Sequence, residues 1–290
     1  MDHQLNLLTI DLEEWFSVEI FSDRYSFEDW AKLPSTLVHN SRLLLDLFER
    51  KSVRATWFVL GWCAERHPDL IREIYRAGHE IACHSYRHRQ VGTLTPEAFR
   101  ADTERARDAV TGAVGVPPSG YRAPSWSLDE TVPWAFETLA ELGFEYDSSI
   151  FPIKHDIYGM PGGPRHLFKM KFDSGKYLYE VPASTYRLFG QNLPIGGGGY
   201  LRHSPYWYSR RMIRRLNSQG HPVVVYVHPW EFDPDPPGVK GLSAVQRFRT
   251  YGSTGTFVYK LERLLDEFEF ACMADYIAFT TKKKIGFDRQ

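Results

Sequence analysis

The sequence has little of what marks secreted, disulfide-stabilised or membrane-spanning proteins. Its 290 residues contain three cysteines, Cys63, Cys83 and Cys272, with no Cys-x-x-Cys pair, so we expect reduced, structural thiols. No apolar run approaches the ~18 residues that span a bilayer, so a transmembrane segment is not expected. The first apolar stretch, residues 5–10, lacks a basic flank and a small-residue cleavage site. We therefore predict a cytoplasmic protein.

An excess of charge of one sign is also missing. The chain has 35 Lys and Arg against 36 Asp and Glu, a formal net charge of −1, so no clustered basic surface for nucleic acid is expected. Hydrophobic residues make up 43% and charged residues 24% of the chain, which excludes disordered and collagen-like classes. A chain of this length can bury a sizeable core without disulfides. Nothing in the composition predicts the oligomeric state.

One local pattern recurs along the chain: a helix, a glycine that ends it, and a short apolar strand. Further strands are predicted at residues 5–10 and 55–60, and further helices begin after Ser35 and at Thr95-Pro96. Strands that alternate with helices indicate a parallel α/β sheet or barrel. The three repeats of the pattern are 68–77, Gly78 and 79–83; 131–142, Gly143 and 144–146; and 206–219, Gly220 and 223–227.

Two segments interrupt this alternation. Residues 150–199 are rich in proline and glycine and are predicted as long loops with one strand at 177–181. Residues 233–255 are predicted to be irregular, before a helix at 258–268. The run Gly196–Gly199 is not a phosphate loop, because no Gly-Lys-Ser/Thr follows it, and we expect a flexible or closely approaching substrate loop.

Polar residues follow several predicted strands, and the carboxyl ends of parallel strands meet at one face. His84 and His88 lie four residues apart, so both imidazoles can reach one ion if the segment turns helically. The chain has 11 histidines, so this spacing alone also fits a chance pair. Ser85 stands where the glutamate of a His-Glu-x-x-His metalloprotease would be.

Three carboxylates, Asp11, Glu13 and Glu14, follow the first strand. Crowding them without an adjoining Lys or Arg is unfavourable unless a cation neutralises them, although an acidic helix start is the alternative. Two histidines and one carboxylate suit Zn²⁺, or Co²⁺, Ni²⁺ or Mn²⁺, with coordination positions left for water and substrate. Arg122 and His228 add a cation and a third imidazole at later strand ends.

In this order the segments resemble the polysaccharide deacetylases with NodB homology, the fourth carbohydrate esterase family. The resemblance spans about residues 5–230. An acidic first motif, a Gly-rich segment at 192–200 and His228-Pro-Trp-Glu resemble more closely the branch found in exosortase-associated (PEP-CTERM) exopolysaccharide loci. The family's motifs correspond to Asp11–Glu14, His84-Ser85-x-x-His88, Arg122-Ala123-Pro124, Tyr146-Asp147-Ser148-Ser149 and Tyr226-Val227-His228.

The resemblance implies an α/β fold, a distorted (β/α)7 TIM-like barrel with long loop insertions and a C-terminal extension. It implies one catalytic domain over 1–290, in which 231–290 packs on a barrel at 5–230. The implied activity is metal-dependent removal of acetyl groups, N-acetyl above all, from a polysaccharide or its lipid-linked precursor, the latter met at the inner membrane face. An allantoinase-like amidohydrolase of a small cyclic amide or ureide, and a catalytically silent glycan-binding module, are the alternatives.

The sequence departs from the family pattern at three places. Leu12 stands where the family has its metal-binding aspartate, so the ligand shifts to Glu13 or Glu14. Residues two apart in an extended strand share a face, which favours Glu13 beside Asp11 and leaves Glu14 open. Ser125 replaces the usual aromatic after Arg-x-Pro, and Tyr226 replaces a leucine.

The resemblance also implies a role for each site residue. The divalent metal, zinc first, is held by Glu13 or Glu14 with the two histidines. The proton-transfer groups are Asp11 as base and His228 as acid, which Arg122 and Asp147 keep oriented. On the substrate side, the Ser125 N–H binds the oxyanion, Trp126 supplies an aromatic wall, and Tyr226 shapes the pocket for the acetyl methyl.

Overall fold

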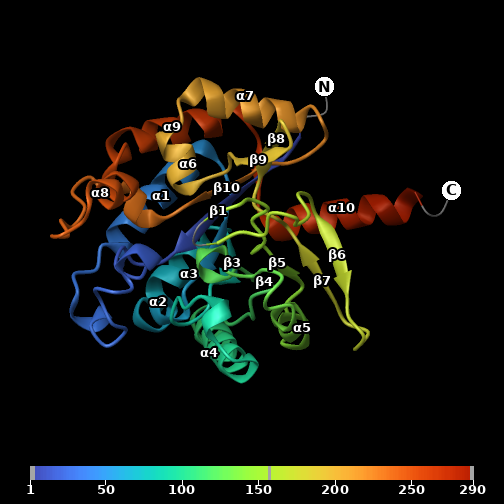
Figure 1. The fold of residues 1–290 in the computed structure, drawn as a ribbon, viewed down its shortest axis with the longest axis horizontal. Helices are drawn as coiled ribbons and strands as arrows, with labels where there is room; N and C mark the ends of the chain where they lie inside the picture. The colour runs from blue at the N-terminus through green and yellow to red at the C-terminus, as the bar shows by residue number, and fades with distance from the viewer. Residues whose placement is uncertain (1–3, 156–157, 288–290) are drawn as a thin grey trace.

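The fold is built on a curled parallel sheet (Figure 1). The computed structural model describes residues 4–155 and 158–287. Along the sheet the strands run in the order β10-β1-β2-β3-β4-β5-β7-β6, all neighbours parallel except β6 and β7, and β11 pairs with the start of β1. This confirms the predicted α/β class and distorted barrel. The strands are β1 (Asn6–Leu12), β2 (Thr56–Val59), β3 (Glu80–Cys83), β4 (Gly120–Tyr121), β5 (Tyr146–Asp147), β6 (Phe168–Lys171), β7 (Tyr177–Glu180), β10 (Val224–Val227) and β11 (Phe270–Ala271).

Strand β1 shows how the sheet separates core from site. Its seven residues are all buried, and their side chains alternate between the two faces of the sheet. Leu8 and Ile10 pack in the main core with the surrounding helices, whereas Leu7 packs inside the barrel. Thr9 and Asp11 follow Leu7 on this inner face, where both contact the Arg122 guanidinium. The inner face therefore changes from apolar to polar toward the carboxyl end of the strand.

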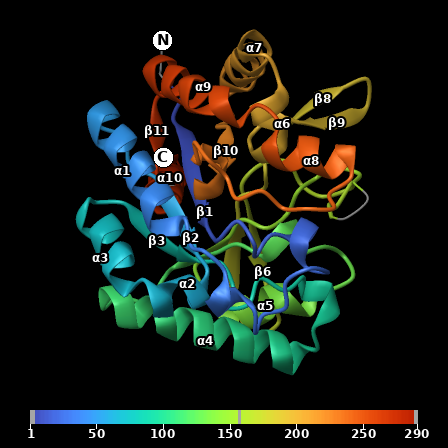
Figure 2. The same cartoon turned by 90° about the vertical axis from the view of Figure 1, so that its left-hand side faces the viewer.

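Helices cover the outer side of the sheet, with α2 to α5 along one side and α1, α7 and α9 along the other (Figures 1 and 2). The predicted start at Thr95-Pro96 is confirmed, because the Thr95 side chain accepts a hydrogen bond from the Ala98 N–H. The helices are α1 (Leu37–Lys51), α2 (Gly61–Arg66), α3 (Pro68–Arg76), α4 (Pro96–Val114), α5 (Trp134–Glu141), α6 (Gly198–His203), α7 (Tyr206–Asn217), α8 (Ala244–Tyr251), α9 (Thr254–Glu267) and α10 (Met273–Phe287).

Two predictions about irregular segments are wrong. The strand predicted at 177–181 is confirmed as β7, but residues 150–199 hold three further strands, which are β6 and a separate hairpin of β8 (Thr185–Leu188) and β9 (Gln191–Pro194). Its two turn residues, Phe189 and Gly190, both have positive φ, and a phenylalanine there gives no sequence signal for such a turn. Residues 233–255 contain α8, which begins with a capping box between Ser243 and Gln246.

The glycine run lies beside β10 and is joined to it by a bridge between Gly197 and Tyr226. A Cβ on Gly196 would lie 2.1 Å from the Val224 carbonyl oxygen, and one on Gly197 would lie 2.1 Å from that of Tyr226. Of the two predicted alternatives, a flexible loop and a closely approaching one, the run is therefore the closely approaching one, because its backbone lies against that of β10. Ser184 also bonds to β10, because its Oγ accepts a hydrogen bond from the Val224 N–H at 2.8 Å.

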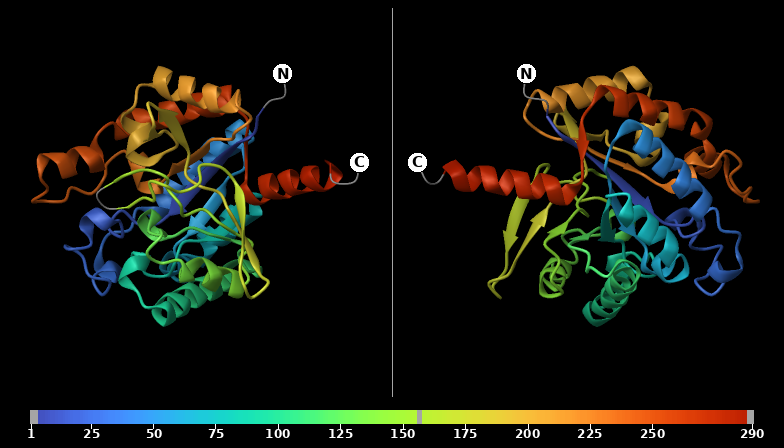
Figure 3. Two further views of the ribbon diagram at one scale, coloured as in Figure 1. Left: turned by 45° about the vertical axis from the view of Figure 1, so that its right-hand side comes forward. Right: turned by 180° about the vertical axis from the view of Figure 1, so that it is seen from behind.

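The last helix, α10, projects from the body of the molecule (Figure 3). Its first turns pack Met273 and Ile277 against Leu7 and Phe58, inside the amino-terminal end of the barrel. This plug leaves the opposite end for the site. Within the described residues, none of the helices is long and apolar enough to cross a bilayer. The division into a barrel at 5–230 and an extension at 231–290 stays a prediction.

His79 gives the fold a specific sensitivity to acid. Burial lowers the pKa of this imidazole to about 4, helped by the Arg54 charge, and its Nδ1 accepts a hydrogen bond from the Ala55 N–H at 3.1 Å. A lowered pKa contributes stability above the ordinary value of 6.5, which is lost as pH falls toward 4. At ~1.4 kcal/mol per pH unit, we expect this site to lose about 3 kcal/mol of unfolding free energy over that range.

The check is denaturant unfolding at pH 7.5 and pH 4 for the parent and for His79→Asn, whose side-chain oxygen can accept the same bond. The variant is expected to lose about 3 kcal/mol less than the parent. Equal losses in both proteins would show that His79 does not carry this sensitivity.

Candidate active site

Three side chains converge at the carboxyl ends of β1 and β3. Glu13, His84 and His88 are buried, and each offers a donor atom within 4.8 Å of the other two. Glu13 Oε2 lies 2.7 Å from His88 Nε2. The alternation of β1 continues to Glu13, which therefore shares its inward face with Asp11. Sequence reasoning had favoured this carboxylate of the two.

The protonation states of these groups suit a divalent cation. Burial lowers the pKa of His84 to about 4, so the ring is neutral. Its Nδ1 lies 2.8 Å from the Arg122 carbonyl oxygen, which favours the tautomer with a proton on Nδ1 and leaves Nε2 free to bind a metal ion. Burial alone would raise the pKa of Glu13, but the charges of His88 and His228 and a hydrogen bond from His88 lower it to about 2. The pKa of His88 is raised, because Glu13 outweighs burial. A cation would displace the proton that His88 shares with Glu13.

The segment between the two histidines is a bend, not the predicted helical turn. Ser85 and His88 both have left-handed backbone, with φ of 57° and 52°. The His88 N–H donates to Ser85 Oγ at 3.1 Å, which supports the bend. Such strain at non-glycine residues is typical of functional sites.

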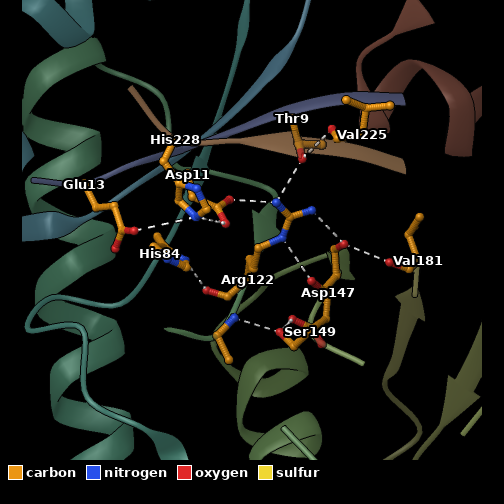
Figure 4. Close-up of polar contacts among 12 residues, drawn as sticks. Thr9, Asp11, Glu13, His84, Arg122, Asp147, Ser149, Val181, Val225 and His228 are labelled. Carbon is orange, nitrogen blue, oxygen red and sulfur yellow. Dashed lines mark hydrogen bonds and ion pairs between the residues drawn. The ribbon is translucent and has the colours of Figure 1, made fainter. Parts of the chain in front are cut away.

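Asp11, Arg122 and His228 lie beside this cluster (Figure 4). Arg122 Nη1 donates to Asp11 Oδ1 at 2.7 Å, and the same guanidinium also bonds Thr9 and the Ser148 backbone. His228 Nε2 lies 3.8 Å from Asp11 Oδ2 and 3.7 Å from Glu13 Oε1. Arg122 therefore fixes one oxygen of Asp11 and leaves the other facing His228.

Sequence reasoning assigned no role to two buried residues behind His228. His228 Nδ1 lies 3.0 Å from Glu231 Oε2, and Arg202 Nε lies 3.2 Å from Glu231 Oε1. Burial opposes the charged imidazole, but the hydrogen bond and charge of Glu231, with Glu13 and Asp11, raise the pKa of His228 to about 9. The only sequence signal for Glu231 is its place as the last residue of the His-Pro-Trp-Glu motif. No sequence pattern indicates a role for Arg202.

Asp147 lies behind the site and not in it. Within the described chain, its side chain is hydrogen-bonded to Ser149 and Glu180, and burial raises its pKa to about 6. The pKa of Glu180, buried beside it, is raised strongly. Ser149 Oγ also accepts from the Ala123 N–H at 2.7 Å. Asp147 is thus linked through the Ser149 hydroxyl to the backbone N–H of the residue after Arg122, and its role in orienting acid and base stays a prediction.

Glu14 points away from the cluster, to the start of α1. Its carboxylate accepts from the Thr36 N–H at 3.4 Å, and burial raises its pKa to about 7 against the hydrogen bonds of Ser35 and Thr36. The predicted Ser35 cap is therefore wrong: α1 begins at Leu37 after Thr36, and Glu14 serves the free N–H. The geometry gives no support to Glu14 as a metal ligand.

The predicted substrate-side residues line a cavity of about 1050 Å³ over the cluster. Ser125 and Trp126 have left-handed backbone, and the Ser125 N–H has no hydrogen-bond partner among the described residues. The Trp126 ring lies over the Arg122 guanidinium at 4.6 Å and contacts Tyr226 edge-on at 4.9 Å. This arrangement places a free N–H donor beside an aromatic wall, and the oxyanion and acetyl roles of these residues stay predictions.

Two family models match the chain. Residues 26–146 match the model described as polysaccharide deacetylase, and residues 148–278 match a domain of unknown function, DUF3473. The second segment supplies Tyr226, His228 and Glu231, so the candidate site combines residues from both segments.

Curated relatives match shorter stretches. Over 107 residues the chain is 31% identical to the peptidoglycan deacetylase of Helicobacter pylori, covering 37% of this chain and 36% of that protein. Over 90 residues it is 30% identical to chitin deacetylase 1 of Cryptococcus neoformans, covering 31% of this chain and 19% of that protein. The chain thus spans well under two thirds of the length of these relatives.

Solved structures match over nearly the whole chain. A Mycobacterium smegmatis protein assigned as a polysaccharide deacetylase aligns with a TM-score of 0.59 at 23% identity, covering 98% of this chain and 93% of that one. A variant of the peptidoglycan deacetylase PdaC from Bacillus subtilis aligns with a TM-score of 0.51 at 11% identity, covering 99% and 96%. These likenesses show the fold alone. Support for the polysaccharide deacetylase family comes from the family model over residues 26–146 and from the relatives.

The Glu231–Arg202 pair predicts a large stability effect. Both side chains are fully buried, so Glu231→Gln leaves the Arg202 charge without its partner. We expect a loss of about 3–5 kcal/mol in unfolding free energy, measured by denaturant titration. A Glu231→Gln, Arg202→Met double variant is expected to recover part of this loss, because it removes the unpaired charge but also the Arg202 bonds to the Thr250 and Arg249 carbonyl groups. A single variant as stable as the parent would contradict the prediction.

Proposed function

We propose, from the support for the polysaccharide deacetylase family, that the protein is a metal-dependent hydrolase that removes acetyl groups, N-acetyl above all, from a polysaccharide or its lipid-linked precursor. One observation carries the proposal. The buried donors of Glu13, His84 and His88 converge beside an Asp11–Arg122 pair and a raised-pKa imidazole, His228.

The donor set fits a divalent cation, zinc first, with Co²⁺, Ni²⁺ or Mn²⁺ as alternatives. His84 Nε2, His88 Nε2 and the Glu13 carboxylate would hold it, and the donor form of His84 is already selected by the Arg122 carbonyl. When bound, such an ion polarises a carbonyl group and lowers the pKa of a coordinated water molecule.

Asp11 is the proposed general base. Its Oδ1 is held by Arg122, and its Oδ2 faces the cavity beside the cluster. This free oxygen accepts a proton from the water that attacks the acetyl carbonyl carbon. The unpaired Ser125 N–H donates to the oxygen that gains negative charge in that step.

His228 is the proposed general acid. A pKa of about 9 keeps the imidazole protonated at neutral pH, and Glu231 holds Nδ1 so that Nε2–H points to the cluster. His228 donates this proton to the sugar nitrogen as the C–N bond breaks. Water and amide are thereby converted to acetate and a free amine.

The glycan is proposed to belong to exopolysaccharide biosynthesis. The Gly-rich segment at 192–200 and the His228-Pro-Trp-Glu motif support this, through their resemblance to the exosortase-associated branch. The cytoplasmic location stays a prediction.

The test compares acetate release from N-acetylglucosamine oligomers with ring opening of cyclic ureides, using zinc- or cobalt-loaded protein. We expect one free amine per acetate, and loss of turnover after verified chelation. Ring opening without acetate would favour the amidohydrolase alternative. Glycan affinity without turnover, with metal present, would favour a binding module.

A further inference from the structure

The cavity over the cluster continues well beyond the reacting groups. This part of the cavity, which we call the extension, reaches α8 and is lined there by Val245, Gln246, Phe248 and Tyr251. Its volume, about 1050 Å³, exceeds the ~300–1000 Å³ that encloses a drug-sized ligand. There is therefore room for more than one sugar residue.

Helix α8 presents an exposed aromatic surface to this extension. Thr250 is the one residue of α8 that is buried, whereas Val245 and Phe248 are 60% and 59% exposed. The Phe248 ring stacks on His203 with centroids 4.2 Å apart and 18° between the planes. Gly252 permits this stack, because a Cβ there would lie 2.7 Å from the His203 ring. Phe248 is thus a flat apolar surface backed by a second ring.

His203 has unused hydrogen-bonding capacity under this surface. Neither ring nitrogen has a partner among the described residues, although both are buried. Burial lowers the pKa of His203, with the charges of Arg202 and Lys260 acting in the same direction against Glu231, so the ring is neutral and offers one donor and one acceptor. Because both nitrogens are enclosed, this neutral ring acts as a support for Phe248 and not as a polar group that faces the cavity.

The same helix is tied to the reacting groups through Arg202. The Arg202 guanidinium donates from Nη1 to the Thr250 carbonyl at 2.7 Å and from Nη2 to the Arg249 carbonyl, while its Nε pairs with Glu231. Figure 2 shows α8 beside α6, the helix that carries Arg202. The extension is therefore held in fixed relation to His228.

The far side of the extension is lined by two segments that are hydrogen-bonded to each other. Arg24, in the segment after β1, donates to the carbonyl groups of Lys240 and Gly241 at 3.0 and 2.8 Å. Residues 18–23 of that segment and Pro236 and Pro237 line the cavity together. The extension is thus part of one bounded cavity and is continuous with the candidate active site.

We propose that Phe248 and His203 form a second sugar subsite, which binds a sugar residue neighbouring the acetylated one. The apolar face of the sugar ring stacks on the exposed face of Phe248, while His203 backs the other face of that ring. The proposal rests on the proposed function and deepens it: the substrate is an oligomeric or polymeric glycan, bound over several residues, and not a single acetylated sugar.

The test is the chain-length dependence of deacetylation. We measure kcat/KM on the monosaccharide N-acetylglucosamine and on its hexamer for the parent and for Phe248→Ala. The parent is expected to prefer the hexamer by at least about tenfold, equivalent to ~1.4 kcal/mol, and Phe248→Ala to lose this preference mainly through KM. Phe248→Trp is expected to retain it. A Phe248→Ala protein with the parent's preference, or a parent without one, would overturn the proposal.

A matched control and a binding measurement separate this proposal from the proposed function. Phe189→Ala removes the same side chain from the tip of the β8–β9 hairpin, where it is 97% exposed and outside the cavity, and is expected to keep the parent's preference. Calorimetry with the hexamer reports binding without turnover. Hexamer affinity about tenfold weaker in Phe248→Ala supports the subsite even if no acetate is released, and equal affinity overturns it.

Discussion

Replacing Asp11 by asparagine is expected to slow acetyl release by about 10²–10⁴-fold, the contribution of one proton-transfer group. Asparagine has nearly the same shape, and its side-chain oxygen can still accept from Arg122 Nη1, as Asp11 Oδ1 does at 2.7 Å. The oxygen that faces His228 is replaced by an amide that does not accept a proton. Because Asp11 is not one of the three converging donors, the variant is expected to retain its metal.

The measurement is kcat alongside metal content per protein chain. Asp147→Asn is the matched control, since this carboxylate is also fully buried but bonds Ser149 and not the cluster. We expect it to lose less than about 10²-fold, the lower bound for a proton-transfer group. An Asp11→Asn protein that keeps both metal and the parent's rate would show that Asp11 is not the base.

The sequence was sufficient where a local rule decides the geometry. Alternation along an extended strand placed Asp11 and Glu13 on one face, and both side chains lie there. The order of strands and helices was enough for the fold class, because parallel strands with helical crossovers have few arrangements. The strand ends then brought His84, Arg122 and His228 to one end of the barrel.

The sequence was insufficient where a contact spans distant segments or an unusual backbone. Glu14 bonds Thr36, 22 residues away, and no local pattern distinguishes it from Glu13 as a ligand. Arg202 meets Glu231 only because α6 packs against the turn after β10. The left-handed backbone of Ser85 carries no sequence signal, because serine rarely adopts it, so the bend between the histidines was missed.

Replacing Glu13 by glutamine is expected to weaken Zn²⁺ binding by more than about 100-fold, which is the upper cost of losing a residue that only supports a ligand. Glu13 is the one carboxylate among the three converging donors of the described chain. The nearby charges of His88 and His228 lower its pKa to about 2, so it is charged at any working pH. Glutamine keeps an oxygen in place but removes the negative charge that attracts the ion. Competition with a chelator of known affinity gives the dissociation constant.

Glu14→Gln makes the same chemical change one residue further along. Its carboxylate serves the Thr36 N–H at the start of α1, and its raised pKa, about 7, means that a neutral side chain already suits this place. Zn²⁺ affinity is therefore expected to stay within about threefold of the parent, since only direct and supporting ligands cost more. If Glu14→Gln loses the ion and Glu13→Gln keeps it, the ligand is the other carboxylate. The segment after β1 must then turn on metal binding, because its alternation directs Glu14 away from the two imidazoles.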